Sequence, residues 1–121
     1  MGRHNELGKA GEDKATQYLV EKGYIILERN YRFGRSEVDI VAVSGKIIVF
    51  VEVKTRTNYA FGLPEESVSR AKQKLLIRAA GNYVCDKDFG SEVRFDIISI
   101  FKSKDDQWSI KHFEDAFFLY D

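Results

Sequence analysis

The chain contains a single cysteine, Cys85, and a single proline, Pro64, among its 121 residues. One cysteine excludes an internal disulfide and a multi-cysteine metal site, and we expect Cys85 to be a small buried hydrophobe. No run of about 18 or more apolar residues is present, which argues against a membrane-spanning helix. The first residues, MGRHNELGKAGEDK, lack the apolar core of a secretory signal. We therefore expect a cytoplasmic protein with no membrane partner.

The chain also lacks net charge, because 19 basic residues balance 19 acidic ones. Neutrality argues against a protein that binds nucleic acid through its overall charge. The distribution is uneven, however, and residues 54–78 carry six basic side chains against only Glu65 and Glu66. On charge alone, a solvated helix face explains this excess better than a binding surface. The basic residues of the segment are Lys54, Arg56, Arg70, Lys72, Lys74 and Arg78.

The length suits one compact domain over residues 1–121. Apolar residues at helical spacing predict a first helix over Leu7–Lys22, closed by Gly23. Pro64 followed by two acids predicts the start of a second helix that runs to about Val84. Its predicted inner stripe consists of Val68, Ala71, Leu75 and Ala79.

Five further segments have the composition of strands, and a short SGK turn makes the second and third an antiparallel hairpin. The order α-β-β-β-α-β-β predicts an α/β protein with a mixed central sheet flanked by helices. The tail EDAFFLYD is short and aromatic, and one hypothesis is a homodimer formed through AFFLY. The predicted strands are Tyr24–Tyr31, Glu37–Val43, Ile47–Lys54, Val93–Lys102 and Trp108–Phe113.

The third predicted strand, IIVFVEVKTR, is apolar on both faces until it reaches Glu52 and Lys54. Strand periodicity puts these two residues on one face, and the hairpin brings Asp39 of the second strand beside them. Carboxylates at close range repel each other, and burial penalises their charged forms. A divalent cation removes both problems, and carboxylate oxygens suit Mg²⁺, which promotes phosphodiester hydrolysis. Taken alone, Glu-x-Lys is a weak motif, and an exposed ion pair explains it better than a functional site does.

Several stretches of the chain together carry a family resemblance. Asp39 followed by Glu52-Val53-Lys54, on a hairpin after an N-terminal helix, resembles the PD-(D/E)xK nuclease signature, with Val38 in place of its proline. The order of elements is similar to the restriction-endonuclease-like fold. The closer resemblance is to the YraN-type family of uncharacterised bacterial proteins, itself related in pattern to archaeal Holliday-junction resolvases. Its matching stretches cover most of the chain: GKAGEDKATQYL, ERNYR, EVDIVAV, FVEVKTR, FGLPEESV and RFDII.

This resemblance implies roles for five residues. Asp39 and Glu52 would ligate Mg²⁺ or Mn²⁺, helped by the main-chain carbonyl of Val53. Lys54 would act on the nucleophilic water or the scissile phosphate. Glu12 matches a first-helix glutamate of the resolvases and would support the metal through water, although a surface acid is an equally good explanation.

Other candidates have weaker support. Glu37 shares the face of Asp39, but an exposed pair with Arg35 explains it as well. Arg56 and Lys72 are predicted phosphate contacts, whereas Lys74 and Arg78 fit a solvated helix face. Tyr59 and Phe61 fall in the loop after Lys54, where they would either stack on a splayed base or anchor their own loop. His4 and His112 lack a ligand-like spacing, which favours structural or surface roles.

The sequence therefore predicts a metal-dependent endonuclease that hydrolyses DNA, with branched or damaged DNA as candidate substrates. The alternative is a non-catalytic nucleic-acid-binding module of the same fold. Neutral charge would make its affinity modest and strongly dependent on salt. Fold alone does not decide between these functions.

Overall fold

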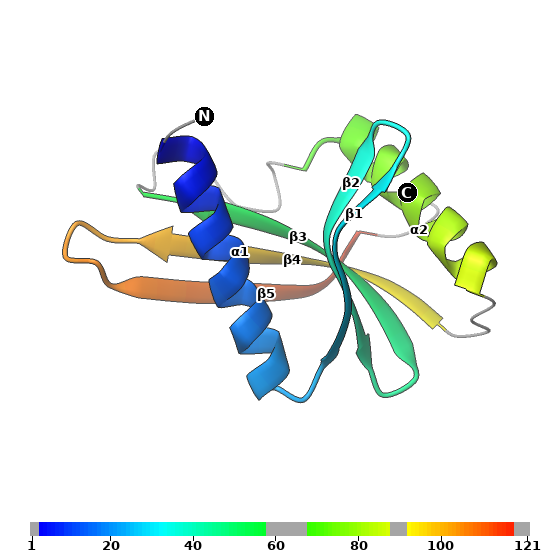
Figure 1. Cartoon of the computed structure of the whole chain (residues 1–121), viewed down its shortest axis with the longest axis horizontal. Helices are drawn as coiled ribbons and strands as arrows, with labels where there is room; N and C mark the ends of the chain where they lie inside the picture. Colours follow the sequence, from blue (N-terminus) through cyan, green and yellow to red (C-terminus); the bar gives the residue numbers. More distant parts are fainter. Residues whose placement is uncertain (1–2, 58–67, 88–91, 118–121) are drawn as a thin grey trace.

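The computed structural model describes residues 3–57, 68–87 and 92–117 of the chain. Their order, α-β-β-β-α-β-β, confirms the predicted α/β class with a five-stranded mixed sheet and two helices (Figure 1). No helix in these ranges is long and apolar enough to cross a membrane. The elements are α1 (Arg3–Glu21), β1 (Ile25–Phe33), β2 (Ser36–Ser44), β3 (Ile47–Arg56), α2 (Arg70–Lys87), β4 (Glu92–Lys102) and β5 (Trp108–Phe117).

The sheet has the order β1-β2-β3-β4-β5, so each strand lies beside its neighbours in the chain. The pairs β1–β2, β2–β3 and β4–β5 are antiparallel, and β3–β4 is parallel. The predicted hairpin of β2 and β3 is confirmed, with Gly45 at a φ of 62° in its turn. A parallel pair needs a long crossover connection, and here that connection contains α2.

The two helices cover opposite faces of the sheet (Figure 1). Val49 and Val51 of β3 pack in the core on the α1 side, with Ala15 and Leu19. Ile48 and Phe50 pack in the core on the α2 side. Because both faces of β3 are buried, its apolar run has no alternation, as expected for a strand that lies inside a sheet covered on both sides.

α1 approaches β3 closely at Gly11, which is buried. A Cβ atom at this position would lie 1.9 Å from Thr55 Oγ1 and 2.8 Å from Thr55 Cγ2. Only glycine therefore allows the helix this approach. At the other end of α1, Gly23 has a φ of 95°, which confirms it as the residue that ends the helix.

α2 begins later than predicted, because Val68 and Ser69 are not helical. Ser69 caps the helix by accepting a hydrogen bond from the Lys72 N–H at 3.1 Å. The predicted inner stripe is wrong at Ala71 and Leu75, which are exposed. Val68 and Ala79 of the predicted stripe are buried, and Tyr83 of the helix packs edge-on against Phe50. The residues of α2 that face the core are Leu76, Ala79, Ala80 and Tyr83. The prediction that Pro64 starts this helix lies outside the described residues.

One expectation for a single side chain is wrong, and part of the aromatic tail lies in the core. Cys85 is exposed on α2 rather than buried. Phe117 of the aromatic tail is only 5% exposed and stacks on Phe95 with ring centroids 5.0 Å apart. β5 thus extends into the tail, and Phe117 packs in the core of its own chain. The homodimer through AFFLY stays a prediction. The rest of the tail lies outside the described residues.

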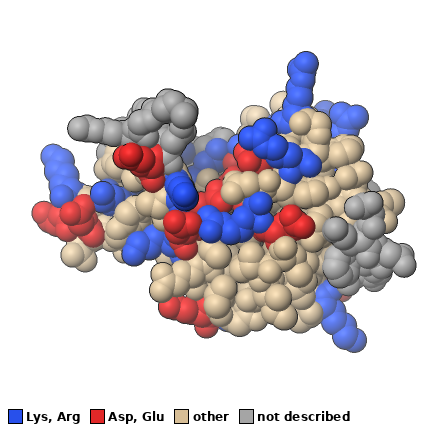
Figure 2. Space-filling view, viewed as in Figure 1, with Lys and Arg blue, Asp and Glu red and all other residues tan. Residues whose placement is uncertain are grey.

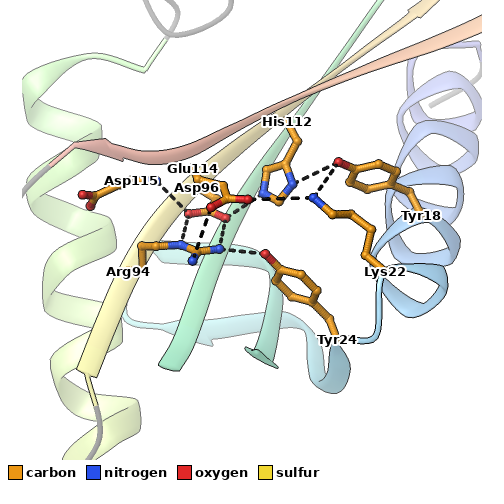
Figure 3. A network of polar contacts seen from close by, with 8 residues as sticks. All are labelled: Tyr18, Lys22, Tyr24, Arg94, Asp96, His112, Glu114 and Asp115. Atoms are coloured by element: carbon orange, nitrogen blue, oxygen red, sulfur yellow. Dashed lines mark hydrogen bonds and ion pairs between the residues drawn. The ribbon is translucent and has the colours of Figure 1, made fainter. Parts of the chain in front are cut away.

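A buried polar network joins β4 and β5 beneath the end of α1 (Figure 3). The carboxylate of Asp96, 0% exposed, accepts hydrogen bonds from Arg94 Nε at 2.9 Å and from the Asp115 N–H at 3.0 Å. His112 Nε2 lies 2.6 Å from the same carboxylate, and His112 Nδ1 lies 3.2 Å from the Tyr18 hydroxyl. His112 is therefore structural.

This network also explains an irregularity of the sheet. Phe95 pairs with Phe117 and Ile97 with Phe113, so three residues of β5 stand opposite Asp96 alone. Asp115, with a φ of 54°, turns its N–H toward the Asp96 carboxylate. Burial alone raises the pKa of Asp96, but the hydrogen bonds from His112 and Arg94 outweigh it and hold the pKa below its ordinary value.

The close approach of α1 to β3 leads to a stability prediction. Gly11→Ala should destabilise the protein by about 1–3 kcal/mol, the usual cost of forcing atoms into a packed site. Gly8→Ala is the matched control, because nothing lies within 4 Å of a Cβ there and alanine is favoured over glycine in a helix. Urea unfolding measures both free energies. Equal effects of the two substitutions would contradict the packing argument.

Candidate functional site

β2 and β3 stop pairing at the point where the polar residues begin. Their paired residues run from Ser44 opposite Ile47 to Ile40 opposite Val51. At the next position the side chain of Asp39 takes over, and its Oδ2 accepts a hydrogen bond from the Val53 N–H at 2.7 Å. The hairpin therefore brings Asp39 beside the Glu52-Val53-Lys54 segment, as predicted from the strand periodicity.

Glu52 is the charged centre of this site. Its side chain is 4% exposed, and its Oε2 lies 3.3 Å from Lys54 Nζ and in contact with Lys72 Nζ. Among the described residues, its Oε1 is buried and has no hydrogen-bond partner. Buried polar atoms are nearly always paired, so this oxygen is open to a further ligand.

Burial, and after it the nearby charge of Glu52, raise the pKa of Asp39 to about 7, although the hydrogen bond from the Val53 N–H acts against both. The charge of Glu12 makes a smaller contribution in the same upward direction. For Lys72, burial lowers the pKa, but the contact with Glu52 outweighs burial and leaves the pKa above its ordinary value. The site is thus a pair of interacting carboxylates that favours positive charge beside it.

Glu12 lies on α1, next to Gly11, and is held at the edge of the site. Its Oε1 accepts hydrogen bonds from Arg29 Nη2 and Asn30 Nδ2 of β1, both at 3.0 Å. Asn30 has a φ of 56°, a left-handed conformation that asparagine tolerates better than most residues. Glu12 therefore acts on Asp39 through its charge, while β1 fixes its position.

Of the remaining predicted residues, the structure describes Glu37 and Arg56. Glu37 pairs with Arg32 at 3.6 Å rather than with Arg35, and its side chain is 39% exposed. Arg56 is half-buried at the end of β3, opposite Phe101 of β4. Tyr59 and its neighbour Phe61 fall outside the described residues.

Sequence reasoning missed the two β1 residues that hold Glu12, and it missed the contact of Lys72 with Glu52. The predicted phosphate contact of Lys72 stays a prediction. Arg29 and Asn30 occur in the stretch ERNYR, which carried part of the family resemblance, but their side chains were given no role. No sequence pattern predicts the contact of Lys72 with Glu52, because the contact depends on where α2 begins relative to the end of β3.

The oxygen atoms at this site fit a hard divalent cation. No three His, Cys, Asp or Glu side chains of residues 3–57, 68–87 and 92–117 gather closely enough to bind a metal by themselves. Mg²⁺ does not require this, since it usually binds one or two carboxylates and keeps several waters. Asp39, Glu52 and the Val53 carbonyl would hold such an ion, and the unpartnered Glu52 Oε1 is the observation that fits it.

The surface charges on the face shown in Figure 2 are mixed. Figure 2 shows Lys and Arg side chains at the upper right, over the tip of the β1–β2 hairpin and the start of α2, whereas both signs alternate across the middle of this face. At the site itself, Lys54 and Lys72 are engaged with Glu52. The basic excess of residues 54–78 is therefore used in part to neutralise a buried carboxylate.

The raised pKa of Asp39 predicts a pH effect on stability without metal. Because the folded pKa of about 7 exceeds the ordinary value of 3.8, the native state binds more protons than the unfolded chain between these values. Ionised Asp39 therefore lowers stability progressively as pH rises through this interval. Asp39→Asn keeps an acceptor for the Val53 N–H and removes the charge. The free energy of unfolding of Asp39→Asn minus that of the wild type should therefore increase from pH 5 to pH 8. The expected increase is about 1.4 kcal/mol for each pH unit of this range that lies below the pKa of Asp39 in the folded protein.

Urea unfolding in EDTA at the two pH values measures this difference. Glu37→Gln is the matched control, because it removes a carboxylate from the same strand at a more exposed position. A stability difference between Asp39→Asn and wild type that stays constant with pH would contradict the assigned environment of Asp39.

Comparison with known proteins agrees with the resemblance to the YraN-type family. The model of the uncharacterised protein family UPF0102 matches residues 11–100. A UPF0102 protein of Flavobacterium psychrophilum is 48% identical over 118 residues, which are 98% of each chain. One of Bacteroides thetaiotaomicron is 47% identical over 118 residues, or 98% of this chain and 97% of the relative. One of Dictyoglomus turgidum is 48% identical over 83% of this chain and 86% of the relative. This chain belongs to the uncharacterised protein family UPF0102.

Proposed function

We propose that this protein is a metal-dependent endonuclease of the PD-(D/E)xK superfamily, with a restriction-endonuclease-like fold, that hydrolyses phosphodiester bonds in DNA. The observation that carries the proposal is the buried carboxylate of Glu52. Within the described part of the chain, one of its oxygens has no hydrogen-bond partner and the other contacts two lysines. Asp39 lies beside it with a raised pKa. A merely structural Glu-Lys pair at a strand end needs neither the burial nor the second carboxylate.

Each side chain has a role that its position supports. Asp39 and Glu52 would hold Mg²⁺ or Mn²⁺, which when bound polarises an attacking water and offsets charge on the leaving oxygen. Lys54, on the same face of β3 as Glu52, is 24% exposed, so its ammonium reaches the side from which a phosphate approaches. It would orient the attacking water or neutralise the scissile phosphate. Glu12, fixed by Arg29 and Asn30, supports the negative potential that attracts the cation.

The substrate proposed here is DNA, with branched or damaged forms as the preferred candidates. A neutral protein with a mixed surface has little general attraction for duplex DNA. Shape and local distortion of the substrate must then supply much of the selectivity. A DNA substrate would require the protein to act in the cytoplasm, where DNA is present, and none of the described helices is long and apolar enough to cross a membrane.

A cleavage assay tests the proposal. Labelled duplex, single-stranded, flap and four-way-junction DNA is incubated with the protein in Mg²⁺ or Mn²⁺. We expect products that depend on the metal and a rate at least about 100-fold lower for Lys54→Ala, the typical contribution of a group that handles protons in the transition state. Lys46→Ala is the matched control, because this exposed lysine lies in the turn at the other end of the same hairpin.

Two results would contradict the proposal. Wild-type protein that cuts none of these substrates argues against a nuclease, and full activity of Lys54→Ala argues against the assigned site.

One observation favours a second function, a nucleic-acid-binding module without catalysis. Lys54 and Lys72 already compensate the charge of Glu52, so the fold does not require a cation for this carboxylate. Binding of DNA that persists in EDTA, with no product in Mg²⁺ or Mn²⁺, identifies this alternative.

A further inference from the structure

Lys72 combines a fixed backbone with a side chain that reaches solvent. It is the third residue of α2, and its N–H donates to the capping hydroxyl of Ser69 at 3.1 Å. Its side chain is 40% exposed, although its ammonium contacts the carboxylate of Glu52, which is 4% exposed. The lysine stem can therefore swing away from Glu52 without any movement of the helix.

A cation bound at Oε1 of Glu52 would oppose the contact of Lys72 with Oε2 of the same carboxylate. Lys72 Nζ and Lys54 Nζ both lie against Oε2, so the carboxylate already carries two positive neighbours. A divalent ion on the same carboxylate adds a larger positive charge, which repels both ammonium groups. Lys72 is the one that can leave at low cost, because it is the more exposed of the two and comes from a different element, whereas Lys54 is fixed on the strand of Glu52 itself.

We propose that Lys72 is a displaceable counter-ion of the Glu52 site. Without metal it neutralises Glu52; when a divalent cation binds, it moves out and becomes available to a phosphate of the substrate. This inference rests on the proposed function, and it gives Lys72 a positioning role that the position of Lys54 does not allow. It also accounts for both the predicted contact of Lys72 with phosphate and its observed contact with Glu52.

The proposal makes a prediction about metal affinity that needs neither DNA nor cleavage. Lys72→Met removes the ammonium and keeps a flexible apolar stem of similar length. Since a unit charge a few ångströms from a half-buried ion opposes its binding strongly, Lys72→Met should bind Mn²⁺ and Ca²⁺ roughly tenfold to a hundredfold more tightly than wild type. Calorimetric titration of the full chain, first freed of metal with EDTA, measures this.

Thermal unfolding supplies a second readout. In EDTA, Lys72→Met should melt at a lower temperature than wild type, because the buried carboxylate has lost one of its two compensating charges. At saturating Mn²⁺ this difference should shrink or reverse. Lys74→Met, two residues along α2 at an exposed position, is the matched control and should change neither measurement.

The possible outcomes separate this inference from the proposed function. Tighter metal binding by Lys72→Met alone supports the inference, even where wild-type binding is too weak to measure. Wild-type binding that Lys72→Met leaves unchanged overturns the counter-ion role while the metal site of the proposed nuclease stands. No metal binding by either protein overturns both the inference and the metal site.

Discussion

The hydrogen bond from the Val53 N–H to Asp39 determines the architecture around the candidate site. At this position a side chain replaces the main-chain partner that β2 would otherwise offer to β3. β2 continues its ladder with β1, and β3 continues its ladder with β4. The carboxylate thus satisfies a donor at the place where two neighbouring strands separate, and that separation leaves room for Glu52 among apolar strands.

Charge balance sets the second constraint. Three acids interact at this point: Asp39 and Glu52 from the hairpin and, more weakly, Glu12 from α1. Arg29 of β1 compensates Glu12, and Lys54 of β3 and Lys72 of α2 both compensate Glu52. Asp39 accepts the hydrogen bond from the Val53 N–H. Elements that cover both faces of the sheet therefore meet at one cluster, and the close contact of Gly11 with Thr55 keeps α1 near enough to take part.

The parts of this arrangement that depend on local periodicity were predictable, and those that depend on loops were not. Strand alternation and a short turn suffice to place Asp39 beside Glu52, because a tight hairpin transmits register directly. The predicted start of α2 was too early. Proline and acids are favoured in the first turn of a helix, which led to a start at Pro64, but the residue that caps α2 is Ser69. The partner of Lys72 and the burial of His112 against Asp96 required the tertiary structure, since residues distant in sequence meet there.

The parallel pairing of β3 with β4 has a consequence for folding. Three strand pairs join segments that are close in the chain: β1–β2, β2–β3 and β4–β5. The fourth pair, β3–β4, joins segments that are separated by the crossover containing α2. Closing such a distant contact is slow compared with forming a hairpin. Until it closes, the apolar edge of β3 has no partner, and an unpaired apolar edge promotes aggregation. Nascent or refolding chains should therefore be most vulnerable to self-association before β4 docks, and the segment exposed in that interval is the same one that later buries Glu52.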